Sequence, residues 1–212
     1  MLMDGLGVRP ALFDMAERLA AGGYFVALPD LYYRAGIPAP GPKLFSDPEL
    51  RAEWSKSVLP TVSIANIMRD MPAFFAYLDD HRAVRHGMYA TTGYCLGGRL
   101  SLAAAGHYPD RLAAAASYHG GGLATDAPDS PHLLAPRIKA RVYVAGAIED
   151  KNFDDAQKQR LENALTAAHV EHTVETYPAR HGWVPSDTPV HDPVQAERHW
   201  KTLFALLDRQ LA

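Results

Sequence analysis

The chain has 212 residues, of which 48% are hydrophobic and 21% charged, and its formal net charge is −3. No basic excess indicates nucleic-acid binding, and no run of about 18 apolar residues indicates a membrane-spanning helix. The first residues lack the basic-then-apolar order of a signal peptide. A single cysteine excludes an internal disulfide framework and is typical of a reducing compartment, so we expect a cytoplasmic protein.

Helical and strand patterns alternate along the chain. Apolar spacing and Pro/Gly punctuation predict, in chain order, a helix over 10–21, a strand over 24–30, an irregular loop over 35–50, a helix over 62–81, a strand over 87–94, a helix over 99–108, strands over 111–120 and 140–147, a helix over 153–169, a strand over 171–178 and a helix over 192–211. Pro72 should kink its helix near Met68. The order predicts a single α/β domain over residues 1–212, with a mainly parallel sheet and helices on both faces.

The only cysteine lies in the stretch GYCLGG, directly after the predicted strand over 87–94. Residues 93–97 fit the pattern Gly-x-nucleophile-x-Gly, in which glycines permit a sharp strand-to-helix turn around Cys95. A helix N-terminus favours a thiolate, and the Leu96 N–H would face a developing oxyanion. The alternative is a small buried hydrophobe. A phosphate-binding loop is excluded, because the glycine spacing fits neither nucleotide motif.

Two further reactive residues, Asp150 and His181, each follow a predicted strand. The chain order is nucleophile, acid, histidine, as in α/β-hydrolases. Histidine suits the role of general base because its pKa lies near neutrality, and a carboxylate would orient it. Glu149 is an alternative acid, and either carboxylate could instead cap the helix over 153–169. His119 also follows a predicted strand, so these patterns do not decide between the two histidines.

Four segments of the chain resemble the dienelactone hydrolase family: GYCLGG, PDLYYR (29–34), GAIEDKNF and ARHGW. The resemblance extends over nearly the whole chain and implies an α/β-hydrolase fold. It also implies a catalytic triad of Cys95, His181 and Asp150 that acts on esters or lactones without a cofactor. No His/Cys cluster has metal-ligand spacing, so we expect no metal.

The resemblance also implies roles for the residues near the start of the chain. The family has an acidic residue, usually glutamate, that interacts with the resting thiol, and here Asp4 stands at that place. The next amide, that of Gly5, would be the second oxyanion donor beside Leu96. Asp4 could instead cap the turn into the helix over 10–21.

Substrate recognition is implied at two positions. Arg34 matches a family arginine that binds the substrate carboxylate, and Trp183 would contribute apolar surface. The alternative for Arg34 is a solvated loop charge. The family has a second arginine four residues after the histidine, where this chain has Pro185, so the substrate is expected to differ from dienelactone itself.

The family normally has one or two strands before the segment at which this chain begins. The N-terminal strands are therefore expected to be missing from the sheet. An uncovered sheet edge exposes backbone groups and apolar faces, so we expect reduced stability or a homodimer.

Together these features predict a cysteine-dependent hydrolase of small carboxylic esters or lactones, with no nucleic-acid or membrane partner. Thioesters are an alternative substrate class for the same triad. Two competing hypotheses are a non-catalytic binding module with this fold and a thiol redox sensor, although the chain has no resolving cysteine.

Overall fold

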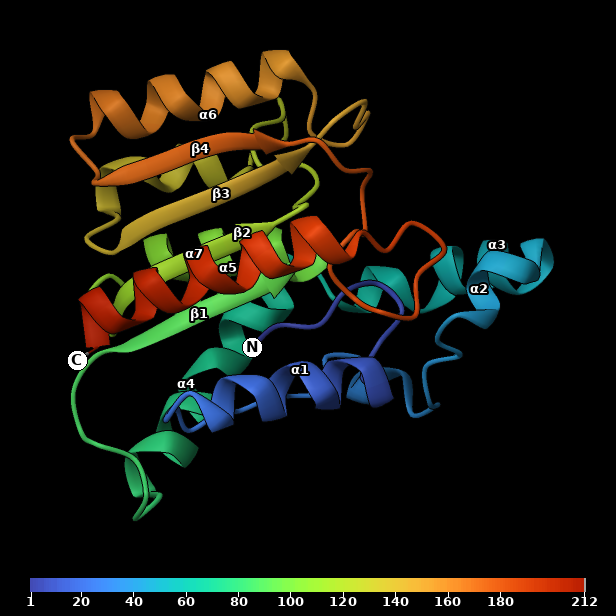
Figure 1. The fold of residues 1–212 in the computed structure, drawn as a ribbon, viewed down its shortest axis with the longest axis horizontal. Coiled ribbons are helices and arrows are strands. Elements are labelled where there is room, and N and C mark those ends of the chain that lie inside the picture. The colour runs from blue at the N-terminus through green and yellow to red at the C-terminus, as the bar shows by residue number, and fades with distance from the viewer. Residues whose placement is uncertain (212) are drawn as a thin grey trace.

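The computed structural model describes residues 1–211, which form one sheet of four parallel strands and the helices around it (Figure 1). The strands lie side by side in chain order: β1 (Tyr89–Tyr94), β2 (Leu112–Tyr118), β3 (Arg141–Ala147) and β4 (His172–Tyr177). The register pairs Thr91 with Ala115 and Val144 with Val174. Because all strands run in one direction, their carboxyl ends meet at one edge, and the predicted parallel sheet is confirmed.

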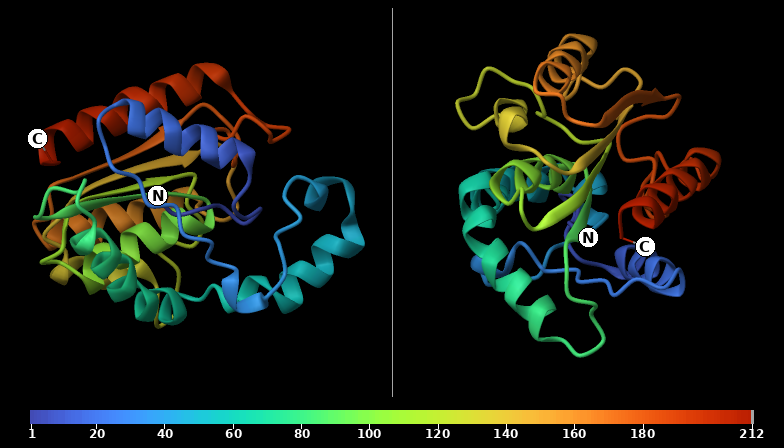
Figure 2. Two further views of the ribbon diagram at one scale, coloured as in Figure 1. Left: turned by 90° about the horizontal axis from the view of Figure 1, so that it is seen from below. Right: turned by 90° about the vertical axis from the view of Figure 1, so that its left-hand side faces the viewer.

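Helices cover both faces of this sheet (Figure 2). One face carries α5 (Leu96–His107), which packs on β1 and β2, together with α4 (Ile64–Asp80) and α6 (Asp155–Ala167). The other face carries α7 (Pro193–Leu211) and, beside it, α1 (Pro10–Ala21). Within residues 1–211, no helix combines the length and the apolar character needed to cross a bilayer.

The central strands are buried on both faces, which explains their continuous apolar sequences. In β2, LAAAASY, every residue but one is buried, and β3 is buried from its second residue onward. The alanines of β2 also permit a helix when read alone. Burial between α5 and α7 favours the strand, because small side chains let both helix layers approach the sheet.

The strand predicted over 24–30 is wrong: this segment is extended but belongs to no strand. The chain start lies between it and β1, since the Met1 amino group donates to the Ala27 carbonyl (2.7 Å). The contact with β1 is a single bridge from Leu2 to Gly93. Without a regular ladder on either side, the backbone of 24–30 has no partner that would make it a strand.

Pro72 lies inside α4, which continues through it. Proline has no N–H, so the carbonyl four residues earlier loses its helical donor. That carbonyl belongs to Met68, and it accepts a hydrogen bond from the Tyr108 hydroxyl at the end of α5 instead. The packing of α4 against α5 therefore supplies the hydrogen bond that the sequence removes.

The loop predicted over 35–50 is only partly irregular. It contains the short helix α2 (Lys43–Ser46) and the start of α3 (Pro48–Ser57), which project from the body of the fold (Figure 2). Asp47 caps α3 by accepting the Leu50 N–H (2.9 Å), and Pro48 occupies the first helical position. Two other short helical turns, at Tyr33–Ala35 and Leu59–Thr61, flank this region.

Candidate active site

Cys95 lies in a strained turn between β1 and α5. Its φ of 52° and ψ of −113° fall in a region that non-glycine residues rarely adopt. The neighbouring glycines make this turn sterically feasible: a Cβ on Gly93 would overlap the Gly97 carbonyl, and one on Gly97 would overlap the Leu2 carbonyl. The structure thus builds the turn that the pattern Gly-x-Cys-x-Gly predicts.

A positive φ angle at a non-glycine residue also occurs at the carboxyl ends of the neighbouring strands. His119 directly follows β2 and has a φ of 41°, and Glu149, two residues after β3, has a φ of 53°. Three adjacent strands are therefore each followed, within two residues, by a non-glycine residue with positive φ. Such residues cluster at functional sites, where the surrounding fold holds them in place.

Asp150 and His181 meet above this edge of the sheet. His181 Nδ1 lies 2.7 Å from Asp150 Oδ2, and the Asp150 side chain is 1% exposed. The other carboxylate oxygen accepts the Asn152 N–H at 2.9 Å. With its Nδ1–H donated to Asp150, the imidazole keeps Nε2 free to accept a proton from a nucleophile.

The contact between Asp150 and His181 shifts the pKa of both side chains. Burial alone would raise the pKa of Asp150, but the hydrogen bonds from His181 and Asn152 outweigh it and lower that pKa. Burial alone would lower the pKa of His181, but Asp150 and the Cys95 sulfur outweigh it and raise that pKa to about 10. An imidazolium beside a thiol is the pairing found at reactive cysteines.

The shifts predict how this pair contributes to stability as the pH changes. The His181 pKa is raised above its ordinary value of 6.5, so its contribution is complete below about pH 6.5 and is lost as the pH rises towards 10. The Asp150 pKa is lowered, so its contribution is present above about pH 4 and is lost as the pH falls through the lowered value.

Histidine NMR gives a direct measurement. The His181 ring resonances, assigned by their absence in His181→Ala, should still report an imidazolium at pH 8. In Asp150→Asn the same resonances should titrate at lower pH, because the main group that holds the proton is gone. An unshifted titration near pH 6.5 in the wild type would contradict the predicted ion pair.

One pocket contains both Cys95 and His181. It has a volume of about 490 Å³. Its lining comes from the carboxyl ends of the strands and the loops above them: Gly5, Leu59, Cys95, Leu96, Arg99, Gly121, Gly122, Thr125, Lys151, Asn152, Gln157 and His181. Among residues 1–211, no three His, Cys, Asp or Glu side chains lie close enough together to hold a metal ion.

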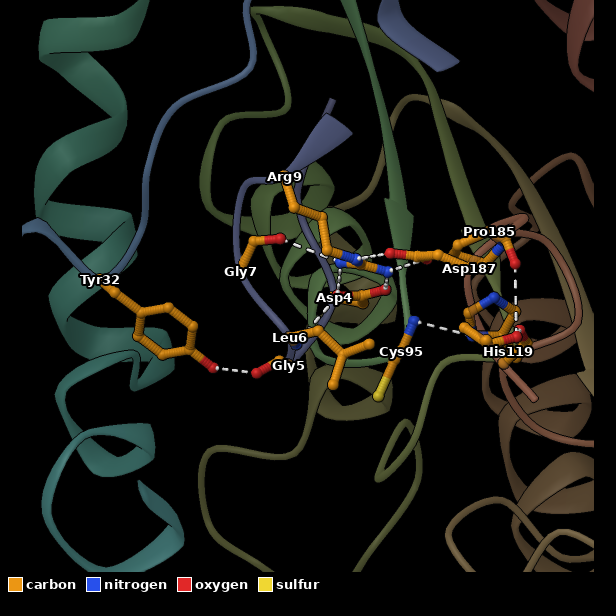
Figure 3. A network of polar contacts seen from close by, with 12 residues as sticks. Asp4, Gly5, Leu6, Gly7, Arg9, Tyr32, Cys95, His119, Pro185 and Asp187 are labelled. Carbon is orange, nitrogen blue, oxygen red and sulfur yellow. Dashed lines mark hydrogen bonds and ion pairs between the residues drawn. The ribbon is translucent and has the colours of Figure 1, made fainter. Parts of the chain in front are cut away.

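Two backbone amides at this pocket are free to donate. Among residues 1–211, neither the Leu96 nor the Gly5 N–H has a hydrogen-bond acceptor. The Gly5 carbonyl accepts the Tyr32 hydroxyl at 2.9 Å, which holds the Gly5 peptide in place (Figure 3). Two preorganised donors beside a nucleophile form the arrangement needed to bind a developing oxyanion.

Comparison with known proteins identifies the family of this chain. The model of the "Dienelactone hydrolase family" matches residues 1–211. The chain belongs to the dienelactone hydrolase family. It is 27% identical to the "Putative carboxymethylenebutenolidase" of Synechocystis sp., over 100% of this chain and 85% of the relative. It is 24% identical to the carboxymethylenebutenolidase of Rhodococcus opacus, over 100% of this chain and 80% of the relative.

Solved structures show the same fold. The "Putative Dienelactone Hydrolase" of Klebsiella pneumoniae has a TM-score of 0.84 at 24% identity, covering 98% of this chain and 84% of that one. The dienelactone hydrolase-like phosphotriesterase P91 from metagenomic libraries has a TM-score of 0.73 at 21% identity, covering 99% and 84%. This member of the dienelactone hydrolase family therefore has the α/β-hydrolase fold.

Asp4 lies in a buried ion network and not against the thiol (Figure 3). Arg9 Nη1 and Nη2 contact the two Asp4 oxygens at 2.7 and 2.9 Å, and Arg9 Nε and Nη2 contact Asp187 at 2.7 and 3.0 Å. Asp4 also caps the turn before α1, because its Oδ1 accepts the Leu6 N–H at 2.9 Å, although the N-cap of α1 itself is Arg9. The guanidinium therefore ties the Asp4–Gly7 loop to the segment after His181, and no hydrogen bond joins Asp4 to the Cys95 sulfur.

Arg34 and Trp183 both lie outside the lining of the Cys95 pocket. Arg34 forms a two-pronged ion pair with Asp70 on α4, one contact being 2.5 Å. Trp183 is fully buried, stacked on Tyr177 and packed against the edge of His119. The structure does not bring these two side chains together with the predicted triad residues.

His119 and Glu149, which compete with His181 and Asp150 in the sequence, have different surroundings. His119 is fully buried, and its Nδ1 accepts the Cys95 N–H at 3.1 Å. Burial keeps the pKa of His119 well below its ordinary value, so it stays neutral and holds the nucleophile's backbone (Figure 3). Glu149 is exposed, and it makes no hydrogen bond to His181.

Sequence reasoning missed Arg99, Lys151 and Arg9. One signal for Arg99 was present: it is a cation in the first turn of the helix that follows Cys95. Lys151 directly follows the predicted acid. Arg9 offered no signal, because its partner Asp187 is 178 residues away.

Proposed function

We propose that this member of the dienelactone hydrolase family cleaves carboxylic esters or lactones through an acyl-cysteine intermediate. One observation carries the proposal: the hydrogen-bonded pair Asp150–His181 and the strained Cys95 turn line or border one pocket that also contains two free amides. The names of the relatives, carboxymethylenebutenolidases, support a lactone or ester substrate.

In the acylation step, the Cys95 thiolate attacks the carbonyl carbon of the substrate. The negative charge that develops on the carbonyl oxygen is bound by the Gly5 and Leu96 amides. When the tetrahedral intermediate collapses, the C–O bond breaks and the leaving alkoxide takes a proton from the His181 imidazolium. With a lactone, the alkoxide stays attached to the acyl group.

In the deacylation step, His181 Nε2 removes a proton from a water molecule that attacks the acyl-cysteine. The thiolate leaves, and the product is a carboxylic acid. Asp150 holds the ring in place and stabilises the imidazolium in both steps. Neither step requires a group from outside the chain other than water.

An acyl-transfer assay tests the proposal. Wild-type protein mixed with 4-nitrophenyl acetate and quenched in acid should show an acetyl adduct by intact mass, located on the peptide that contains Cys95. The Cys95→Ala variant should show neither adduct nor turnover while keeping its circular dichroism spectrum. Turnover in folded Cys95→Ala, or an adduct on another residue, would refute the acyl-cysteine mechanism. A folded wild type with neither activity nor adduct would favour a binding module.

A further inference from the structure

The pocket around Cys95 has an unbalanced charge. Its lining contains two permanent cations, Arg99 and Lys151, and no carboxylate. Asp150 directly precedes Lys151, but it is buried in its pair with His181 and does not line the pocket. A pocket lined by cations and lacking acids attracts anionic ligands and disfavours cationic ones.

Arg99 differs from the other arginines of the chain. Most of them form ion pairs with carboxylates: Arg9, Arg18, Arg34, Arg111, Arg141, Arg160, Arg198 and Arg209. Among residues 1–211, Arg99 is the only arginine that lacks an ion pair and is still partly buried. Its Nε is buried and has no hydrogen-bond partner within these residues.

An unpartnered buried guanidinium nitrogen is costly unless a ligand supplies the acceptor. Arg99 lies in the first turn of α5, one helical turn after Cys95 and beside Gly122. Cys95 and Arg99 line the same pocket, so a substrate held at Cys95 can also meet the guanidinium.

We propose that Arg99 is the anion-binding residue of this active site and that it recognises a carboxylate on the substrate, with Lys151 assisting at the exposed rim. The preferred substrates are then esters or lactones that carry a second, anionic group. This inference rests on the proposed function. It assigns carboxylate recognition to Arg99 in the first turn of α5 and not to Arg34, whose guanidinium is paired with Asp70.

A matched pair of substrates tests the inference: mono-4-nitrophenyl adipate and its methyl ester, which differ only in the charge at the far end. For the wild type, kcat/KM should be on the order of 10–100-fold higher for the anionic ester, the range expected for a charge-assisted hydrogen bond. In Arg99→Gln this preference should vanish, mainly through a higher KM for the anionic ester. Arg99→Lys should keep part of the preference.

The control is Arg180→Gln, which removes the same charge from an exposed arginine next to His181 that does not line the pocket. Arg180→Gln should keep the preference for the anionic ester. An equal loss of preference in this variant would show that only the overall positive charge near the pocket matters, and not a contact with Arg99. No preference in the wild type, or a preference that survives in Arg99→Gln, would overturn the inference while hydrolysis of the neutral ester upholds the proposed function. If neither ester is cleaved and no adduct forms, the proposed function fails and this inference fails with it.

Discussion

Replacing Asp150 with asparagine should lower kcat for an activated aryl ester by roughly 10³–10⁴-fold. The amide can keep the hydrogen bond from the Asn152 N–H, but it would donate to His181 Nδ1 where the carboxylate accepts. The ring would then carry its proton on Nε2 and could not take one from the thiol. Steady-state kinetics on wild type and variant measure the effect.

The matched control is Glu149→Gln, which neutralises the neighbouring acid. Glu149 is exposed and makes no hydrogen bond to His181, so its removal should change kcat less than about threefold, as expected for a surface substitution. If the two variants lose activity equally, or if Glu149→Gln loses more, the acid of the triad has been assigned to the wrong residue.

Replacing Arg9 with leucine should lower the free energy of unfolding by about 3–5 kcal/mol, because it leaves the buried Asp4 carboxylate without its counterion. Both oxygens of Asp4 and both oxygens of Asp187 lose a donor. The loop that presents the Gly5 amide also loses its tie to the segment after His181, so turnover should fall as well. Urea denaturation at pH 7 measures the change in stability.

Arg18→Leu is the matched control, since Arg18 lies on α1, the helix that Arg9 precedes, and also forms a two-pronged pair, with Glu197. Those side chains are 43% and 56% exposed, so the loss should be at most about 1 kcal/mol. Adding Asp4→Asn to Arg9→Leu should restore part of the stability, because no uncompensated buried charge remains. Equal losses at the two arginines would mean that the buried network is not what stabilises this loop.

The sheet could be predicted from local sequence because β2 and β3 are largely apolar runs, while β1 and β4 are rich in β-branched and aromatic residues. The runs at 87–94, 111–120, 140–147 and 171–178 each contain one observed strand. The run at 24–30 has the same local character but no hydrogen-bonded ladder, and pairing is a tertiary property that a local pattern does not encode. The helix α3 carries its own start signals, Asp47 and Pro48, although the prolines around it favour a loop.

Some residues of the candidate site could likewise be predicted from the sequence, whereas the partners of others could not. Cys95, Asp150 and His181 follow strands of a parallel sheet, so their order along the chain already predicts that they meet at one edge. The structure brings Asp150 and His181 into contact, and their catalytic roles stay predictions. The partners of Asp4 and Arg34 depend on how distant loops and helices pack, and no spacing rule relates Arg9 to Asp187 or Arg34 to Asp70.

The positive φ angles of Cys95, His119 and Glu149 have a consequence for how this protein can be evolved in the laboratory. Each such residue costs the folded state on the order of 1–3 kcal/mol, and glycine would remove most of that strain. A selection that rewards heat resistance alone would therefore favour glycine at Cys95 and at the exposed Glu149, but not at His119, whose removal would leave a cavity in the core. Thermostable variants obtained without a simultaneous screen for activity should accumulate glycine at these two positions, and those that replace the proposed nucleophile should lose turnover.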